Sequence, residues 1–189
     1  TTAAGETIEA TTDIYIRAAR NVLGTTPAFG NSATVHNEWG YATLGQQGDE
    51  LYQENGSHID AQTYVTLDNW SGTATSNAYG VGNEETISNV GSDTGLIAIQ
   101  NNYVSVYSSA SFSGSSNHGD GIVTTTSIGN AATATLCNVC GDAALHGTTQ
   151  QHNAGAIVAN GTATVGHAGS IHGAATAVGN AATYQSNGH

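Results

Sequence analysis

Apolar and polar residues alternate over a long stretch near the start of the chain. One set of alternate positions is mostly apolar and reads Ile8, Ala10, Thr12, Ile14, Ile16 and Ala18. The positions between them carry more polar side chains, among them Glu9, Asp13 and Arg17. Because successive side chains of a β-strand point to opposite faces, this period of two predicts one long strand over residues 8–18.

Shorter alternating segments follow, separated by clusters of Gly, Asn and Ser. They comprise residues 64–67, 96–99, 103–107, 122–126 and 133–136. Pro27, the single proline, lies in a Gly24–Gly30 region that we expect to form a turn after the first strand. No stretch has a convincing helical period. The sequence therefore predicts an all-β fold, either an elongated β-solenoid or a β-sandwich.

A short motif recurs along the chain, in which Gly is followed by Asn or Thr and then by small residues. Its glycines are Gly30, Gly72, Gly129, Gly161 and Gly179. The last two copies are 18 residues apart, so the tail from about Asn153 is interpreted as two related units of strand, glycine bend and strand. The earlier spacings are irregular, and a chain so rich in Gly, Asn, Ala and Thr also produces such strings by chance.

These patterns divide the chain into three parts. Residues 1–24 hold the N-terminal strand, residues 25–120 form a β-rich region, and residues 121–189 form a repeat-containing β-region with both cysteines.

Composition narrows the range of partners. The chain has 14 acidic residues against two basic ones, Arg17 and Arg20, and a formal net charge of −12. Nucleic acids and anionic membranes carry charge of the same sign, so both are poor partners. Val, Ile, Leu and Phe together number only 32 of 189 residues. Stacked β-repeats or contacts with neighbouring subunits must therefore order the chain, because a thick aliphatic core cannot.

The start of the chain bears on its location. It begins at Thr1 and contains no methionine. Thr1 is then either a processed N-terminus or the start of a fragment. A removed signal peptide is the simplest account, so we expect export to the cell surface. No apolar run approaches the roughly 20 residues of a membrane-spanning helix, and we expect no membrane insertion.

Two cysteines, Cys137 and Cys140, lie close together. In an exported chain we expect the pair to form a local disulfide. Two alternatives stay open, namely free thiols and a metal site that includes His146 and His152, although the spacing matches no zinc-finger pattern.

Nothing in the sequence marks a catalytic centre. Serines and histidines are abundant, but no Gly-x-Ser-x-Gly elbow singles out a nucleophile. Gly-Asp pairs at Asp49, Asp120 and Asp142 would suit calcium outside a cell, yet the nonapeptide pattern of calcium-binding β-rolls is missing. Glu84 and Glu85 are interpreted as a solvated turn. We therefore expect no enzyme, no catalytic residue, no resident metal and no cofactor, with calcium as the alternative.

The C-terminal third resembles a known family. The likeness rests on Ser127 to Thr135, with its Gly-Asn-Ala-Ala core, and on residues 137–140, 150–155 and 177–180. These segments, within residues 121–188, are similar to the repeat region of holdfast-attachment (anchor) proteins of stalked alphaproteobacteria. The resemblance implies an exported, repeat-rich surface protein that helps to fix an adhesive polysaccharide to the cell envelope. The long first half, without clear repeats, departs from that pattern.

These features predict a structural subunit of an extracellular filament or adhesive cell-surface fibre. Its expected partners are copies of itself and a cell-surface polysaccharide. The strand over residues 8–18 is the candidate assembly element, because a long alternating strand can complete the sheet of a neighbouring subunit. Alternatively, it is the first strand of its own sheet.

Two other functions are weighed against the fibre. A secreted carbohydrate-binding module would stack sugar rings on aromatic side chains, several of which must be exposed on one face. The candidates are Trp39, Tyr41, Trp70, Tyr79, Tyr103 and Tyr107. A secreted hydrolase would need clustered histidine and carboxylate side chains with perturbed pKa values in a pocket.

Overall fold

The structure is a computed structural model that describes residues 1–114, 119–138 and 143–188. This part of the chain forms twelve β-strands, and its strands pair in parallel sheets, so the predicted all-β class is confirmed. Within these residues, no helix is long and apolar enough to cross a membrane.

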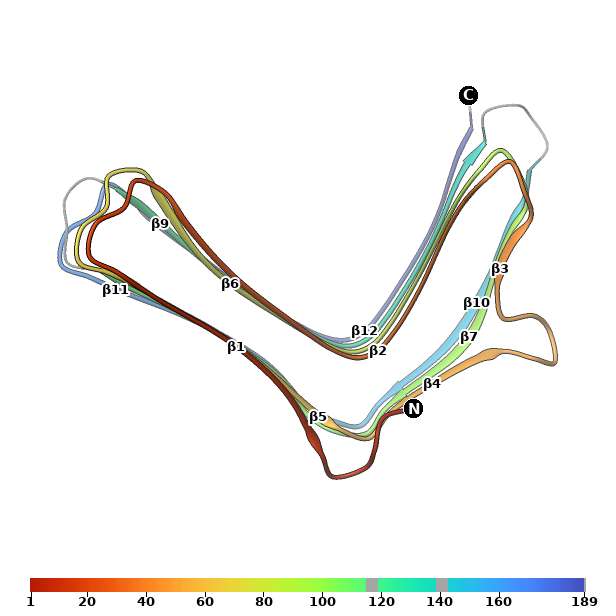
Figure 1. The fold of residues 1–189 in the computed structure, drawn as a ribbon. Coiled ribbons are helices and arrows are strands. Elements are labelled where there is room, and N and C mark those ends of the chain that lie inside the picture. The colour runs from red at the N-terminus through yellow and green to blue at the C-terminus, as the bar shows by residue number, and fades with distance from the viewer. Residues whose placement is uncertain (115–118, 139–142, 189) are drawn as a thin grey trace.

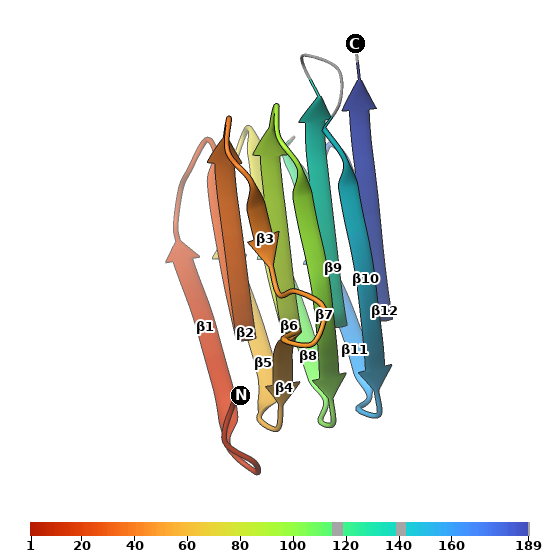
Figure 2. The ribbon, with the colours of Figure 1, turned by 90° about the vertical axis from the view of Figure 1, so that its right-hand side faces the viewer.

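The strands form three sheets. On each turn round the molecule the chain contributes strands to these sheets in the same order (Figures 1 and 2). Sheet I contains, in spatial order, β1 (Thr7–Ile16), β5 (His58–Leu67), β8 (Val106–Gly114) and β11 (Ile157–Val165). Sheet II contains the longest strands, in the order β2 (Val22–Glu38), β6 (Thr73–Val90), β9 (Asp120–Asn138) and β12 (Ile171–Gly188). Sheet III contains β3 (Ala42–Leu44) and β4 (Leu51–Asn55) beside β7 (Thr94–Asn102), followed by β10 (Leu145–Asn153).

Each turn of the winding adds one strand to a sheet, and equivalent residues stack in rows. In sheet I one row contains Ile8, Ile59, Val106 and Ile157. In sheet II one row contains Asn31, Asn83, Asn130 and Asn180, which are 52, 47 and 50 residues apart. The repeating unit is therefore a turn of about 50 residues, and we call each such turn a coil.

This period corrects the interpretation of the tail. Gly161 lies in β11 of sheet I, whereas Gly179 lies in β12 of sheet II. The two glycines occupy different sheets of the same coil, so their separation of 18 residues is the distance from one sheet to the next and not a repeat.

Sheet II is sharply bent, with sheet I lying along one arm and sheet III along the other (Figure 1). The inward-facing positions change phase at the bend. In β6, Ala74, Ser76 and Ala78 are buried before it, whereas Asn83, Glu85 and Ile87 are buried after it. One continuous strand thereby serves two cores, because the alternation shifts by one residue.

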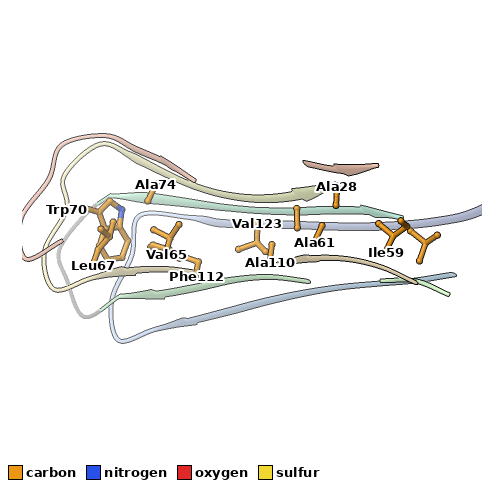
Figure 3. Close-up of a cluster of buried hydrophobic side chains, with 12 residues drawn as sticks. Ala28, Ile59, Ala61, Val65, Leu67, Trp70, Ala74, Ala110, Phe112 and Val123 are labelled. Carbon is orange, nitrogen blue, oxygen red and sulfur yellow. The ribbon is translucent and has the colours of Figure 1, made fainter. Parts of the chain in front are cut away.

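The two cores are thin. Between sheets I and II, a cluster built around Trp70 and Phe112 includes many alanines (Figure 3). The two rings meet edge to face, with centroids 5.1 Å apart and an interplanar angle of 88°. Between sheets II and III, Ile87 and Leu96 pack among four alanines. Small side chains keep the paired sheets close, which is why few large apolar residues suffice.

Pro27 corrects the predicted turn over residues 24–30. It lies within β2, which continues from Val22 to Glu38. This strand is at the edge of sheet II, where the missing N–H of proline is tolerated. The boundary drawn between residues 24 and 25 falls within the same strand.

The shorter predicted segments are mostly parts of longer strands. Residues 64–67 belong to β5 and residues 96–99 to β7, while residues 122–126 and 133–136 both belong to β9. Only the last two residues of the 103–107 segment lie in a strand, β8.

Candidate functional site

The predicted assembly strand is β1, an edge strand of sheet I. It pairs in parallel with β5 of its own chain, from Thr7 with His58 to Ile16 with Leu67. Ile8, Ala10, Ile14 and Ile16 pack partly buried against the first core, whereas Ala18 follows the end of the strand. The structure therefore has the alternative arrangement, in which the predicted assembly strand is the first strand of the chain's own sheet. Pairing between copies stays a prediction.

Three of the five motif glycines lie at the bend of sheet II. Gly30, Gly129 and Gly179 each precede an asparagine of one row, and Gly82 is their equivalent on β6. A Cβ atom at Gly82 would lie 2.6 Å from the carbonyl oxygen of Gly129 and 2.7 Å from Oδ1 of Asn102. Only glycine therefore allows neighbouring coils and sheet III to approach here. Gly72 lies instead in the connection between β5 and β6, and Gly161 within β11.

The asparagines after these glycines form a hydrogen-bonded row, which we call the bend ladder. Nδ2 of Asn31 donates to Oδ1 of Asn83 at 2.7 Å, Asn83 donates to Asn130 at 2.8 Å, and Asn130 donates to Asn180 at 2.8 Å. The second N–H of Asn83 reaches the carbonyl oxygen of Asn101, across in sheet III. The ladder therefore joins successive coils and also fastens sheet II to sheet III.

Two further amide rows face the bend ladder. Asn55 donates to Asn102 at 2.8 Å, and Asn102 donates to Asn153 at 2.6 Å. Among the glutamines, Gln100 donates to Gln53 and Gln151 to Gln100, both at 2.8 Å. Each buried amide keeps its hydrogen bonds, so these polar side chains fill the interior without the cost of unpaired groups.

The bend ladder ends differently at its two edges. Within the described residues, Asn31 has no donor to its Oδ1, and Asn180 donates only to the carbonyl oxygen of Gln151, at 3.4 Å. One edge therefore presents an acceptor and the other a spare N–H. Their chemistry is complementary.

Charge is also unequal between the two edges. Residues 1–57, the first coil, hold half of the carboxylates, namely Glu6, Glu9, Asp13, Glu38, Asp49, Glu50 and Glu54. Residues 143–188 hold none and carry four histidines, His146, His152, His167 and His172. If two copies stacked head to tail, the acidic first coil of one copy would therefore face residues 143–188 of the other, which carry no carboxylate side chain.

Sequence reasoning misjudged Glu84 and Glu85, which lie within β6 and not in a solvated turn. Glu85 is fully buried, and neither of its carboxylate oxygens has a hydrogen-bond partner. Burial raises the pKa of this carboxyl to about 7. Glu84 is half-buried on the opposite face, where desolvation raises its pKa and a hydrogen bond from Ser32 opposes the rise.

The predicted disulfide receives no support. Cys137, at the end of β9, has a free thiol in the structure, and Cys140 lies outside the described residues. In the described part of the chain no three His, Cys, Asp or Glu side chains are close enough together to hold a metal ion. Asp142, one of the three Gly-Asp positions, also lies outside it.

The aromatic candidates for sugar binding are spread over the molecule. Trp70 is 1% exposed and is a core residue, so it is no stacking platform. Trp39 and Tyr41 are 62% and 70% exposed where the chain passes from sheet II to sheet III, and Tyr103 is 48% exposed near the end of β7. Tyr79 and Tyr107 are only partly exposed. Tyr52, which sequence reasoning missed, is 49% exposed.

Comparison with known protein families gives a match. The family model described as HfaD, holdfast attachment protein D, matches residues 1–105. The matched residues lie in the first two coils, whereas the resemblance in the sequence rested on residues 121–188. No curated protein and no solved structure matches the chain.

Proposed function

Because the chain belongs to the holdfast attachment protein D family, we propose that it takes part in holdfast adhesion at the cell surface as a subunit of a filament. In this proposal the regular winding is an elongated β-solenoid, and further copies continue the stack. The family description carries the adhesive role, and the chemistry of the two stack edges supports the assembly.

The observation that carries the assembly is the bend ladder. Continuation of the rows would set β12 of one copy beside β2 of the next, with Asn180 beside Asn31. The spare N–H of Asn180 would then meet the Oδ1 of Asn31 that has no donor. The same operation repeated makes an open, head-to-tail polymer rather than a closed dimer.

Sheet I supports the same contact. Extending its rows would set Ile157 of β11 beside Ile8 of the next copy. Both side chains pack only partly buried against the first core, as do Ile14 and Val165. A neighbouring copy would cover these apolar groups, and parallel backbone pairing would satisfy the strand edges.

Electrostatics bear on the direction of stacking. With a formal net charge of −12, copies repel one another at long range. Contact between the acidic first coil and the carboxylate-free residues 143–188 brings fewer like charges together than contact between two first coils. Head-to-tail order is therefore favoured over head-to-head order.

The test is electron microscopy of the purified chain, dilute and concentrated, with the variant Asn180→Asp. Aspartate keeps the oxygen that accepts from Asn130 but lacks the N–H proposed to reach the next copy. We expect wild-type filaments and at least a tenfold higher concentration for assembly of the variant. Gln185→Glu, on the same strand, adds the same charge outside the ladder and is the matched control.

Two outcomes contradict the assembly. A wild-type chain that stays monomeric at every concentration would exclude the filament. Equal weakening by Asn180→Asp and Gln185→Glu would show that added charge, and not the lost donor, is responsible.

A further inference from the structure

Two tyrosines and a histidine gather on the outer face of sheet III, near its end at Asn55, Asn102 and Asn153. Tyr52 and Tyr103 are 49% and 48% exposed, and His152 is exposed beside Tyr103, with ring centroids 6.1 Å apart. They come from three successive coils of the stack. Aromatic rings that keep about half of their area exposed, with fixed neighbours, offer a surface on which a flat, partly apolar molecule can lie.

Polar groups hold the ring of Tyr52 in place. The hydroxyl of Tyr52 donates to Oε2 of Glu54 at 2.6 Å and accepts from Nδ2 of Asn101 at 3.1 Å. Glu54, Asn101 and His152 are register partners on β4, β7 and β10, so they form a row across the sheet. The carboxylate and the amide are set beside the ring before any ligand arrives.

A shallow hollow adjoins this cluster. Its floor includes Ile97 and Ile99, and it is bordered by Gln47 and Glu50 from the loop before β4 and by Thr148 and Gln150 from β10. Its volume is about 390 Å³, within the size range of small-ligand sites. Tyr52 is the register partner of Ile99, so the hollow and the tyrosines share one face. We call the whole surface the tyrosine face.

We propose that the tyrosine face binds a polysaccharide of uncharged sugars. A pyranose ring has an apolar C–H face that packs on tyrosine rings or on Ile97 and Ile99. Its equatorial hydroxyls donate to carboxylates and exchange hydrogen bonds with amides, and Glu50, Glu54, Asn101 and Gln150 supply these groups.

Charge selects among polysaccharides. The two carboxylates of the tyrosine face and the net charge of −12 repel polymers of uronic acids or sulfated sugars. A neutral chain escapes this penalty. Because most of these side chains, Tyr52, Glu54 and Asn101 among them, stand on strands that are already paired, little ordering is needed on binding.

The experiment measures binding of soluble hexasaccharides to the full chain by calorimetry. The probes are β-1,4-linked glucose, β-1,4-linked N-acetylglucosamine, β-1,4-linked glucosamine and α-1,4-linked galacturonate. We expect at least one neutral probe to bind and galacturonate not to bind. Tyr103→Ala should weaken the neutral interaction at least tenfold, while Tyr15→Ala, an exposed tyrosine on sheet I, should leave it within twofold.

Three results would overturn the proposal. These are no binding of either neutral probe at millimolar concentration, binding of glucosamine alone with loss at high salt, or equal loss in the two tyrosine variants. Repeating the measurement with Asn180→Asp separates this proposal from filament assembly. Asn180 contacts β10 from the inner side of sheet III, at the carbonyl oxygen of Gln151, whereas the tyrosine face is the outer side, so a monomeric chain should still bind.

Discussion

At the scale of single residues, Glu85 is the clearest conflict within the fold. In its row it stands between Ala33 and Ala132, and burial without a partner holds its pKa at about 7 against an ordinary value of 4.5. A carboxyl whose pKa is raised on folding binds its proton more tightly in the folded chain. The folded state therefore loses stability as the pH rises from about 4.5 through 7.

Glu85→Gln should remove this loss. A neutral amide replaces the carboxylate, so we expect the free energy of unfolding at pH 8 to rise by at most about 3 kcal/mol. Below pH 4.5 the difference between variant and wild type should be small. Urea unfolding at pH 4.5, 6 and 8 measures both quantities. Glu9→Gln, at an exposed position on β1, is the control, and the same gain there would refute the assignment to burial.

At the scale of elements, the bend of sheet II depends on the glycines that precede the bend ladder. Gly82→Ala would place a Cβ atom within 2.7 Å of Asn102 and of the Gly129 backbone. We expect a loss of about 1–3 kcal/mol in the free energy of unfolding, as for overpacking of a core. Gly173→Ala meets nothing within 4 Å and should change stability by less than about 0.5 kcal/mol. Thermal or urea unfolding compares the two variants. Equal losses of stability would contradict a steric role for Gly82 at the bend.

Elements were partly predictable. The alternation from Ile8 to Ile16 predicts β1 because one of its faces packs on a core. Gly129-Asn130 and Gly179-Asn180 match the repeated motif because small residues follow them. Gly82-Asn83 does not match it, because Glu84 and Glu85 follow, although it forms the same bend. The change of phase at the bend also breaks a long strand into two shorter patterns, which is why the sequence predicts two segments, 122–126 and 133–136, where the structure has the single strand β9.

At the scale of the whole molecule, the partners of each strand were not predictable from the sequence. Alternation fixes which residues share a face, but parallel pairing over about 50 residues leaves no local turn signal to mark it. The offset also varies between 47 and 52 residues within the bend ladder. Only the stacked rows reveal the Asn and Gln side chains as interior groups and not as surface ones.

Position in the stack should govern the stability of each strand. β6 and β9 are paired on both sides, whereas β2 and β12 are edge strands. In dilute Asn180→Asp protein we therefore expect backbone amides of β6 and β9 to exchange hydrogen at least tenfold more slowly than those of β2 and β12. Hydrogen exchange with mass spectrometry measures this. Uniform protection across all four strands would mean that the edges are covered even in the dilute chain.

The rows of amides also determine how the molecule would bear tension. A pull spread over the two faces at the ends of the stack loads the backbone bonds of all three sheets and the amide bonds together, so no single bond carries the strain. A pull on one strand end would instead peel one coil at a time, breaking a few bonds at each step. The strength of such an attachment would thus depend less on how many bonds it contains than on whether the force acts on a whole coil or on a single strand end.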